Sequence, residues 1–339
     1  MTGRTIVYLP NWLGDMVMAV PFLFSIRMGT KEEIWFCGKS KAIHLYNGLN
    51  LFDRFLPIEG KNVTDFYEAV TFLRKKNFKN GVILPHSFRA ALLFFVGKVK
   101  ERIGYEKNLR GILLSKKLKL KDEVEPTVEH YLRIADYLKI DRVTDTPILA
   151  VTEDEEMSFF ESHDDIKPPY GVFTVGARYG PSKCWPEEYY AKLADMITKG
   201  LGLKIYILPD KDEEQKAKRI KDLCQYKENV EIRYLNLRDL KVCISQASFL
   251  VSNDTGPRHI GSALGIPTLV LLGPMDERYT RYPSSSTFVF NARVPCSPCN
   301  KRVCDRGHEC MKKIQSEVVF EKIMEILNYG KPSWNSRAI

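Results

Sequence analysis

The sequence predicts an α/β protein made of two doubly wound domains, each with a parallel sheet, facing a central cleft. Short β-branched or aromatic runs alternate with helical patterns along the chain, which is typical of parallel sheets covered by helices. The 339 residues are enough for two domains, each with its own core. The alternation breaks at an acidic stretch, residues 153–167, before Pro168 and Pro169, and then restarts. We therefore expect one domain at residues 1–165 and a second at residues 166–339.

Each expected element follows from a local pattern. In the first domain, β-branched and aromatic runs predict strands and apolar residues at helical spacing predict helices: strands at residues 5–9, 33–37 and 81–84, and helices at residues 15–27, 65–76, 88–96 and 128–138. In the second domain the same criteria predict strands at residues 170–175, 204–208, 249–252, 268–272 and near 231, and helices at residues 186–198, 212–223, 237–246, 257–264 and 317–327. The last helix either stays with the second domain or packs back on the first.

Positive charge is concentrated in the first third of the chain. The whole chain carries 51 Lys and Arg against 42 Asp and Glu, whereas residues 1–121 carry 21 against 9. Such a one-sided field indicates an anionic partner: nucleic acid, an anionic membrane surface or a phosphorylated substrate. No apolar stretch reaches the roughly 18–20 residues of a membrane span. The N-terminal segment lacks the pattern of a signal peptide, so we expect a cytoplasmic protein.

Three loops follow predicted strands, and open parallel sheets bind ligands at such strand ends. The first loop, residues 10–15, reads Pro-Asn-Trp-Leu-Gly-Asp. Gly14 would let a ligand approach the backbone closely. Asp15 is either a helix cap or a general base.

The second loop, residues 176–186, begins with a glycine and carries Arg178 and Lys183. Backbone N–H groups and two cations can share the charge of a diphosphate. The alternative interpretation is a solvated loop anchored by Trp185.

The third loop, residues 252–259, leads from a strand into a helix that begins with Thr255, Gly256 and Pro257. Proline suits the first turn of a helix, and a helix N-terminus attracts phosphate. His259 lies one turn inside and is either structural or functional. The three loops would converge on one cleft, which predicts transfer chemistry on a nucleotide-linked substrate.

Longer segments place these loops in a family. The segments PNWLGDMVMAVPFL, GARYGPSKCWPEEYYAKLAD and SNDTGPRHIGSALGIPTLVLLGPMD resemble glycosyltransferase family 9, the ADP-heptose:lipopolysaccharide heptosyltransferases. The NWLGD opening and the GARYGPSK loop are most similar to the heptosyltransferase II group. The resemblance implies a GT-B fold of two Rossmann-like domains and an inverting transfer of heptose from ADP-heptose that requires no metal or other cofactor.

The resemblance also implies roles for single residues. Asp15 matches the proposed base of the family and Lys183 the cation at the donor phosphates. Asp254 and His259 match the donor-binding D-x-G-x-x-H pattern. The expected donor-binding residues are Gly14, Arg178, Asp254, Thr255, Gly256 and His259.

The basic first third fits the acceptor domain that the resemblance implies, because inner-core lipopolysaccharide precursors carry Kdo carboxylates and lipid A phosphates. We expect heptosyl-Kdo2-lipid A as acceptor, with contacts from Lys98, Lys100 and Arg102. Lys107 and Arg110 are further candidates. We also expect peripheral association with the cytoplasmic leaflet of the inner membrane, to which each basic residue near the surface contributes about 1 kcal/mol.

Four cysteines fall within fifteen residues: Cys296, Cys299, Cys304 and Cys310. Four thiolates at this spacing could close a structural zinc site. The alternatives are reduced thiols or disulfides. We expect no catalytic role for a metal there.

Two rival functions are open on the sequence. A heptosyltransferase I or III, an epimerase or another sugar-nucleotide enzyme would share the donor loops and differ in the acceptor domain. A nucleic-acid-binding protein would account for the basic first third. That class lacks support from an RNP-type aromatic motif, a helix-turn-helix or a convincing zinc finger, so we expect no nucleic-acid partner.

Overall fold

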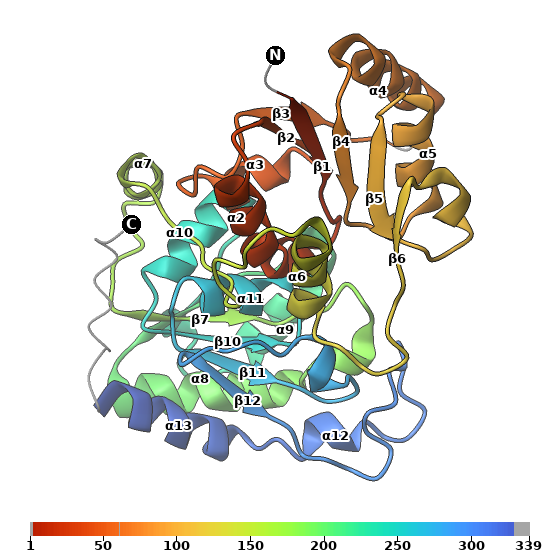
Figure 1. Ribbon diagram of the computed structural model, residues 1–339. Coiled ribbons are helices and arrows are strands. Elements are labelled where there is room, and N and C mark those ends of the chain that lie inside the picture. The colour runs from red at the N-terminus through yellow and green to blue at the C-terminus, as the bar shows by residue number, and fades with distance from the viewer. Residues whose placement is uncertain (1–2, 61, 329–339) are drawn as a thin grey trace. The chain divides into compact units, whose positions relative to one another are not determined.

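The computed structural model describes residues 3–60 and 62–328 and divides the chain into two compact units (Figure 1). The first unit comprises the chain up to residue 150 together with residues 278–283, and the remainder forms the second. The division lies at residue 150 and not at the expected 165, because the acidic stretch forms helix α7 (Glu153–Ser162), which packs against α10 (Leu237–Ser245) of the second unit. A capping box between Thr152 and Glu155 begins α7.

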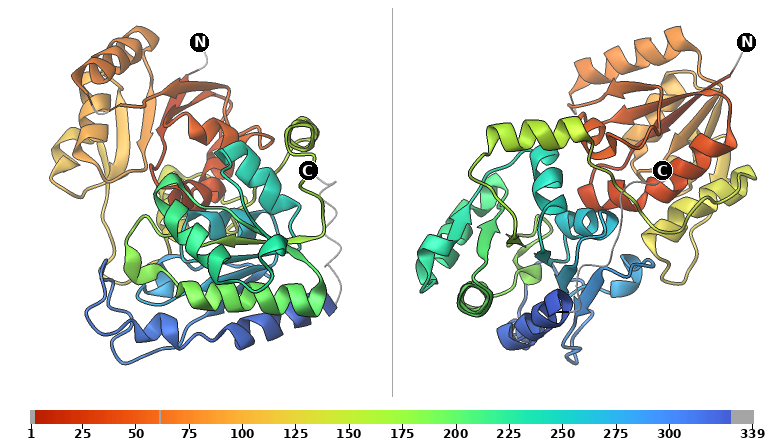
Figure 2. Two further views of the ribbon diagram at one scale, coloured as in Figure 1. Left: turned by 180° about the vertical axis from the view of Figure 1, so that it is seen from behind. Right: turned by 90° about the vertical axis from the view of Figure 1, so that its left-hand side faces the viewer.

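The first unit has a six-stranded parallel sheet with strand order β3-β2-β1-β4-β5-β6. Its strands are β1 (Arg4–Tyr8), β2 (Glu33–Gly38), β3 (Arg54–Pro57), β4 (Asn80–Ile83), β5 (Glu101–Tyr105) and β6 (Lys116–Leu118). Its helices are α1 (Leu13–Met18), α2 (Val20–Gly29), α3 (Lys41–Tyr46), α4 (Val63–Lys76), α5 (Phe88–Val96), α6 (Thr127–Leu138) and the short 3-10 helix η1 (Arg110–Leu113). Helices α4 and α5 cover one face of the sheet, and α2 and α6 cover the other (Figure 2).

The helix expected at residues 15–27 is interrupted. Ala19 separates α1 from α2, and Pro21 lies in the first turn of α2. Because proline has no N–H to donate and clashes with the preceding turn, a continuous helix through Pro21 would be strained. The two shorter helices bury Val17 and Phe22 against the unit.

The second unit has a parallel sheet of the same kind, with order β12-β11-β10-β7-β8-β9. Its strands are β7 (Tyr170–Thr174), β8 (Lys204–Ile207), β9 (Val230–Ile232), β10 (Phe249–Asn253), β11 (Thr268–Leu271) and β12 (Thr287–Phe290). Its remaining helices are α8 (Glu187–Leu201), α9 (Glu214–Leu223), α11 (Gly256–Ala263), α12 (Glu309–Lys312) and α13 (Ser316–Asn328). Helices α8, α9 and α13 lie on one face, and α10 and α11 on the other (Figure 1).

The terminal helix stays with the second unit. Helix α13 packs against α8, and its Val319 and Ile323 are fully buried in the apolar core beneath that face of the sheet. A further contact of this helix with the first unit stays a prediction.

The strand order of each sheet predicts where a ligand binds. The chain builds outward from β1 and then returns to its other side at β4, and it does the same at β7 and β10. Ligands bind doubly wound sheets at the carboxyl ends of strands where the order reverses. The predicted class, two doubly wound α/β units, is confirmed. Among the helices in residues 3–60 and 62–328, none is both long and apolar enough to cross a membrane.

Candidate active site

A pocket of about 550 Å³ lies at the carboxyl ends of β1, β4 and β5 in the first unit. Every residue that lines it belongs to that unit, including Tyr279 from the segment 278–283. The loop after β1 contributes Pro10, Asn11, Trp12 and Asp15. The other walls come from residues 84–87, Lys107, residues 120–125 and helix α6. The first predicted loop thus borders a pocket large enough for a sugar.

Asp15 occupies the first turn of α1, with its residue half-buried at the pocket wall. The N-cap position belongs to Trp12, where no side chain caps the helix, so Asp15 is not the N-cap. Its charge reaches Tyr131 on α6: burial raises the pKa of the Tyr131 hydroxyl, and Asp15 raises it further. A carboxylate at the edge of a polar pocket is placed as a general base requires. Gly14 lies beside Asp15 in α1 but is not among the pocket-lining residues, and its donor contact stays a prediction.

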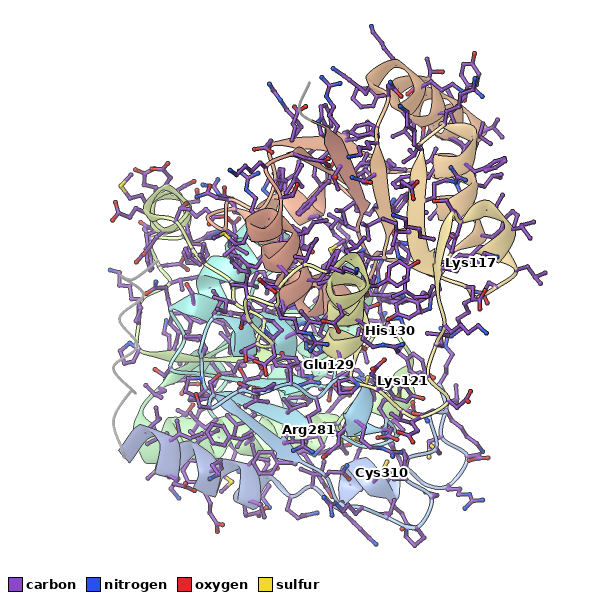
Figure 3. The ribbon with its side chains drawn as sticks, in the orientation of Figure 1. Lys117, Lys121, Glu129, His130, Arg281 and Cys310 are labelled. Carbon is purple, nitrogen blue, oxygen red and sulfur yellow. The ribbon has the colours of Figure 1, made fainter. Side chains whose placement is uncertain are left out.

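Two histidines that are 44 residues apart in the sequence meet in this pocket. His86 follows β4, and its Nε2 lies 3.0 Å from Nε2 of His130 on α6. Figure 3 labels His130. The ring of Tyr105 stacks on His130 with the centroids 3.8 Å apart, and its hydroxyl donates to the His130 carbonyl oxygen. Sequence reasoning missed this pair, although the position of His86 directly after a strand was a signal for it.

The position of Glu125 indicates which ring nitrogens of His86 and His130 carry a proton. Its Oε2 lies 3.8 Å from Nδ1 of His130, and a carboxylate favours an N–H on the facing ring nitrogen. His130 then accepts at Nε2 from the Nε2–H of His86, which leaves a lone pair on Nδ1 of His86. The pair can therefore accept a hydrogen bond from a ligand hydroxyl at His86.

Both histidines are neutral at pH 7. Burial lowers the pKa of His86 to about 3, with His130 lowering it further, and burial lowers the pKa of His130 to about 4 against the opposing effect of Glu125. Unfolded histidine titrates near 6.5, so between about pH 6.5 and 4 the unfolded chain binds more protons. The free energy of unfolding should therefore fall as the pH falls through this window.

We expect His86→Asn to flatten this pH dependence by about 1–2 kcal/mol between pH 7 and pH 5. Urea unfolding at the two pH values measures it. The control is His44→Asn, because His44 is exposed on α3, and it should keep the wild-type slope. An unchanged slope in His86→Asn would show that the buried pair does not resist protonation.

The lysines expected at the acceptor lie away from this pocket. Lys98 and Lys100 are exposed just before β5, at the amino ends of the strands, whereas the pocket lies at the carboxyl ends. Two other lysines, Lys107 and Lys121, line the pocket. Lys107 was among the further candidates from the sequence, and Lys121 was not.

The structure uses Arg102 and Arg110 to hold the backbone of the first unit. The Arg102 guanidinium donates to the carbonyl oxygens of Leu113, Val99 and Lys100 and lies over the Phe95 ring. Arg110 is fully buried and donates to the carbonyl oxygens of Tyr105 and Pro85. Neither guanidinium lines the pocket, so the expected acceptor contact from Arg102 has no support in this geometry.

In the second unit, three charged side chains meet at the ends of β7 and β10. Lys183 donates from Nζ to the backbone carbonyl oxygen and to Oδ2 of Asp254, at 2.8 and 2.9 Å. Nε of Arg258, in the first turn of α11, lies 2.9 Å from Oδ1 of the same carboxylate. The side chains of Lys183, Asp254 and Arg258 are 12%, 3% and 6% exposed. One buried carboxylate thus pairs with two cations.

The balance of charge in this cluster is positive. Burial alone would raise the pKa of Asp254, but Arg258 and Lys183 outweigh it and bring that pKa to about 2. Burial holds the pKa of the neighbouring His259 well below its usual value, so its ring is neutral. With the carboxylate ionised, the two cations leave one net positive charge, which suits an anionic ligand.

The start of α11 adds to this positive potential. The helix begins at Gly256 with Thr255 at the N-cap, and Pro257 occupies the first turn, as predicted. Its first N–H groups lack partners within the helix and attract negative charge. The structure therefore brings Lys183, Asp254, Thr255, Gly256 and His259 together, at one end of the sheet.

Asn253 connects the two donor loops, and sequence reasoning did not identify it. Its buried amide accepts from the Trp185 backbone N–H and the Tyr190 hydroxyl, and it donates to the carbonyl oxygens of Val175 and Gly176. All of the amide's contacts go to the loop after β7 and to α8. Asn253 thus fixes the loop that carries Lys183 against the end of β10.

Two predicted features of the second loop differ in their surroundings. Arg178 is 67% exposed, with Nε 3.9 Å from Asp210, so it is not part of the buried cluster. Gly176 lies directly beneath the Glu213 carboxylate, and a Cβ at Gly176 would collide with it. Burial raises the pKa of Glu213. A larger residue at position 176 would therefore require the Glu213 side chain to move.

The four clustered cysteines lie in the segment that follows β12 and ends in α12. Their thiols are not paired in disulfides, and burial with the neighbouring Cys304 and Cys296 raises the pKa of Cys310. Over the described ranges 3–60 and 62–328, no three His, Cys, Asp or Glu side chains are arranged to hold a metal ion. Binding of zinc by these thiols stays a prediction.

The same segment braces the loop of Lys183. Arg302 donates to the Tyr179 carbonyl oxygen, and Tyr179 donates from its hydroxyl to the Asn300 carbonyl oxygen. The Ser182 N–H donates to the Arg302 carbonyl oxygen, and Nε2 of His308 lies 2.6 Å from the Ser182 carbonyl oxygen. The cysteine-rich segment therefore helps to position the predicted phosphate loop.

Comparisons with known proteins agree with this geometry. A sequence profile of glycosyltransferase family 9 (heptosyltransferase) matches residues 68–309. The chain is similar to lipooligosaccharide heptosyltransferase 2 of Campylobacter jejuni, with 26% identity over 95% of this chain and 99% of the relative. It is also similar to lipopolysaccharide heptosyltransferase 2 of Escherichia coli, with 28% identity over 96% and 98% of the two chains.

A solved structure shares the fold. The ADP-heptose lipopolysaccharide heptosyltransferase II of E. coli superposes with a TM-score of 0.83 at 22% identity, covering 97% of this chain and all of the other. The likeness therefore extends over both six-stranded units.

Proposed function

This chain belongs to glycosyltransferase family 9, the heptosyltransferases, and on that basis we propose that it transfers L-glycero-D-manno-heptose from ADP-heptose to the inner core of lipopolysaccharide. Its two doubly wound units are those of the GT-B fold. The relatives named heptosyltransferase 2 cover nearly its whole length. They favour this activity over that of a nucleic-acid-binding protein.

The observation that carries the donor assignment is the buried cluster in the second unit. Lys183 and Arg258 share the single carboxylate of Asp254 next to the start of α11. The net positive charge and the helix N–H groups fit the diphosphate of ADP-heptose. The same groups would offset the charge that grows on the diphosphate as the sugar leaves.

Asp15 supplies the other half of the proposed chemistry. Its carboxylate takes the proton of the acceptor hydroxyl while that oxygen forms a bond to the anomeric carbon. The bond from that carbon to the diphosphate breaks, and ADP leaves with the electron pair. The attack comes from the face opposite the leaving group, so the configuration inverts. His86 is placed in the same pocket to accept a hydrogen bond from the sugar being glycosylated.

The finer proposal is that the acceptor is heptosyl-Kdo2-lipid A. The deciding experiment measures ADP release from ADP-heptose with Kdo2-lipid A, with and without one heptose already attached. We expect release only with the heptosylated acceptor. Release with the unheptosylated acceptor would assign the chain to the first transfer instead, and release with neither would point to another sugar-nucleotide reaction.

We further propose that the transfer needs no metal and that any zinc at the cysteine segment is structural. A chelator should leave the transfer rate unchanged. Metal analysis of protein purified in reducing buffer without added zinc then tests whether the four thiolates hold a structural zinc. A metal-free sample would remove the zinc proposal. A chelator that abolishes transfer while the fold persists would remove the metal-independent mechanism.

A further inference from the structure

We propose that residues 106–112, here called the wedge loop, insert two apolar side chains into the surface of an anionic lipid bilayer beside the acceptor pocket. The inference deepens the proposed function, and it rests on it in one respect: a lipid-linked acceptor requires the pocket to reach the membrane. The loop leads from β5 into η1 in the first unit.

The wedge loop presents large apolar side chains to solvent. Leu109 is 88% exposed and Ile112 is 80% exposed, whereas Leu113 and Leu114, which follow in the chain, are buried. Leu109 adopts φ +61° directly after Asn108 at φ +55°, a left-handed conformation that is uncommon for leucine. The backbone therefore turns the Leu109 side chain away from the core, although burial would stabilise it.

A buried arginine makes this loop rigid. Arg110 has no exposed surface, and its guanidinium donates to the carbonyl oxygens of Tyr105 and Pro85. Burial lowers the pKa of Arg110 to about 10, which still leaves it charged at pH 7. Because Arg110 lies between Leu109 and Ile112 and points inward, the two apolar side chains are held outward on either side of it. The side chains of Leu109 and Ile112 are thus already exposed in the protein without a membrane.

One end of the wedge loop reaches the acceptor pocket, whereas Leu109 and Ile112 are not among the residues that line it. Lys107 lines the pocket, and the Asn108 amide donates to the carbonyl oxygen of His86, which lines it too. A bilayer that receives Leu109 and Ile112 would therefore lie within a few residues of the pocket. This placement suits a sugar acceptor attached to a lipid.

The charge around the loop matches an anionic surface. Lys107 in the loop and Lys117 and Lys119 beside it are exposed, and the Glu106 N–H donates to the carbonyl oxygen of Leu118 between those two lysines. The Lys117 side chain, on β6, approaches Gly111 within the loop and is marked at the edge of the first unit in Figure 3. Basic side chains around exposed apolar ones are the pattern of peripheral proteins that bind anionic lipid. We therefore choose a bilayer as the occupant, and not a second copy of the chain, whose own basic surface would repel this one.

The test compares Leu109→Asp/Ile112→Asp with Met157→Asp/Val318→Asp. The control double variant adds the same charge at apolar residues of the second unit that are 61% and 51% exposed. Co-sedimentation is measured with vesicles of phosphatidylcholine and phosphatidylglycerol and with vesicles of phosphatidylcholine alone. Wild-type protein should bind the anionic vesicles and lose binding as salt rises.

The wedge variant should bind anionic vesicles on the order of a hundredfold more weakly, about tenfold for each apolar side chain removed. The control should stay within about threefold of wild type, since it leaves the wedge loop and the basic residues beside it unchanged. Lys117→Glu should weaken binding at least about fivefold. Equal binding by the wedge variant and wild type, or no binding of wild type to anionic vesicles, would overturn the proposal. The proposal would also be overturned if wild type formed a dimer, the wedge variant were monomeric, and vesicle binding were unchanged. The loop would then be an interface between copies of the chain.

Transfer to two acceptors separates this proposal from the proposed function. With a deacylated, water-soluble acceptor, the wedge variant should transfer heptose at the wild-type rate. With acceptor embedded in vesicles it should be slower by about the factor lost in binding. If wild type binds vesicles through the loop but transfers heptose to neither acceptor, the proposed function is wrong, while the proposal that the wedge loop binds membranes is supported.

Discussion

Asp15→Asn is expected to lower kcat for heptose transfer by about a thousandfold while leaving ADP-heptose binding unchanged, because the amide keeps the shape of the side chain but cannot take a proton. Asp15 lies in the first turn of α1 at the pocket wall, and the N-cap of that helix is Trp12. The substitution removes a base without removing a cap, so stability should change by no more than about 0.5 kcal/mol. Single-turnover ADP release and ADP-heptose titration measure the two quantities separately.

A matched control is available on the same unit. Glu68 is exposed on α4, and Glu68→Gln removes one negative charge in the same way as Asp15→Asn. It should leave kcat unchanged, which separates loss of a base from loss of net charge. Transfer by Asp15→Asn at close to the wild-type rate, with the donor bound normally, would exclude Asp15 as the base.

Asp254→Ala is expected to lower the free energy of unfolding of the second unit by about 3–5 kcal/mol. The change leaves Lys183 and Arg258, which are 12% and 6% exposed, without the carboxylate that they share. Two buried cations would then repel each other in a site of low dielectric constant. Urea unfolding followed by tryptophan fluorescence measures the loss, because Trp185 is buried beside the cluster and bonded to Asn253.

Two comparisons make this prediction specific. Asp305→Ala breaks an exposed ion pair of 2.7 Å with Lys301 and should leave the free energy of unfolding close to that of wild type, because solvent screens an exposed pair. Lys183→Met together with Asp254→Ala should recover part of the loss, because it removes the repulsion between Lys183 and Arg258. A cost below about 1 kcal/mol for Asp254→Ala would mean that solvent already reaches the cluster.

The same cluster makes the free energy of unfolding depend on pH in the acid range. The pKa of Asp254 is about 2 in the folded protein, below its ordinary value of 3.8. Its stabilising effect is therefore complete above about pH 4 and is lost as the pH falls towards 2. The Asp254→Ala variant should lack this acid transition, so unfolding the same variant across this pH range tests both expectations.

The local patterns of the sequence were sufficient for most of the fold. The buried strands β7 and β10 begin with apolar and aromatic residues, and the loops after them carry glycine, threonine and proline. The short strands β3, β6 and β12 were not predicted. They have only three or four residues, and their side chains are largely exposed or half-buried, so each gives a short and weak signal.

The acidic stretch at residues 153–167 shows a second limit of prediction from the sequence. Its charges suggested a boundary between domains, yet it forms α7, and Glu155 in that helix pairs with Lys241 at 2.9 Å with both side chains buried. The partner lies on α10, 86 residues further along the chain. A pairing over that distance depends on tertiary packing, and composition cannot show it.

The basic residues of the first unit were the least predictable part of the site. Arg102 and Arg110 bond to backbone carbonyl oxygens, while Lys107 and Lys121 line the pocket. All four belong to one basic segment, and only the fold decides which of them turn inward. The histidine pair likewise joins one residue after β4 to one on α6, and the two have no common motif.

The bond between Lys183 and Asp254 has a consequence for turnover. Asp254 offers Lys183 an anionic partner inside the protein at 2.9 Å, so the ammonium keeps a counter-charge when no nucleotide is present. If ADP binds at Lys183 as proposed, its departure exchanges one anionic partner of the ammonium for another. A site built in this way binds the product less tightly than two bare cations would, which favours release of ADP after each transfer.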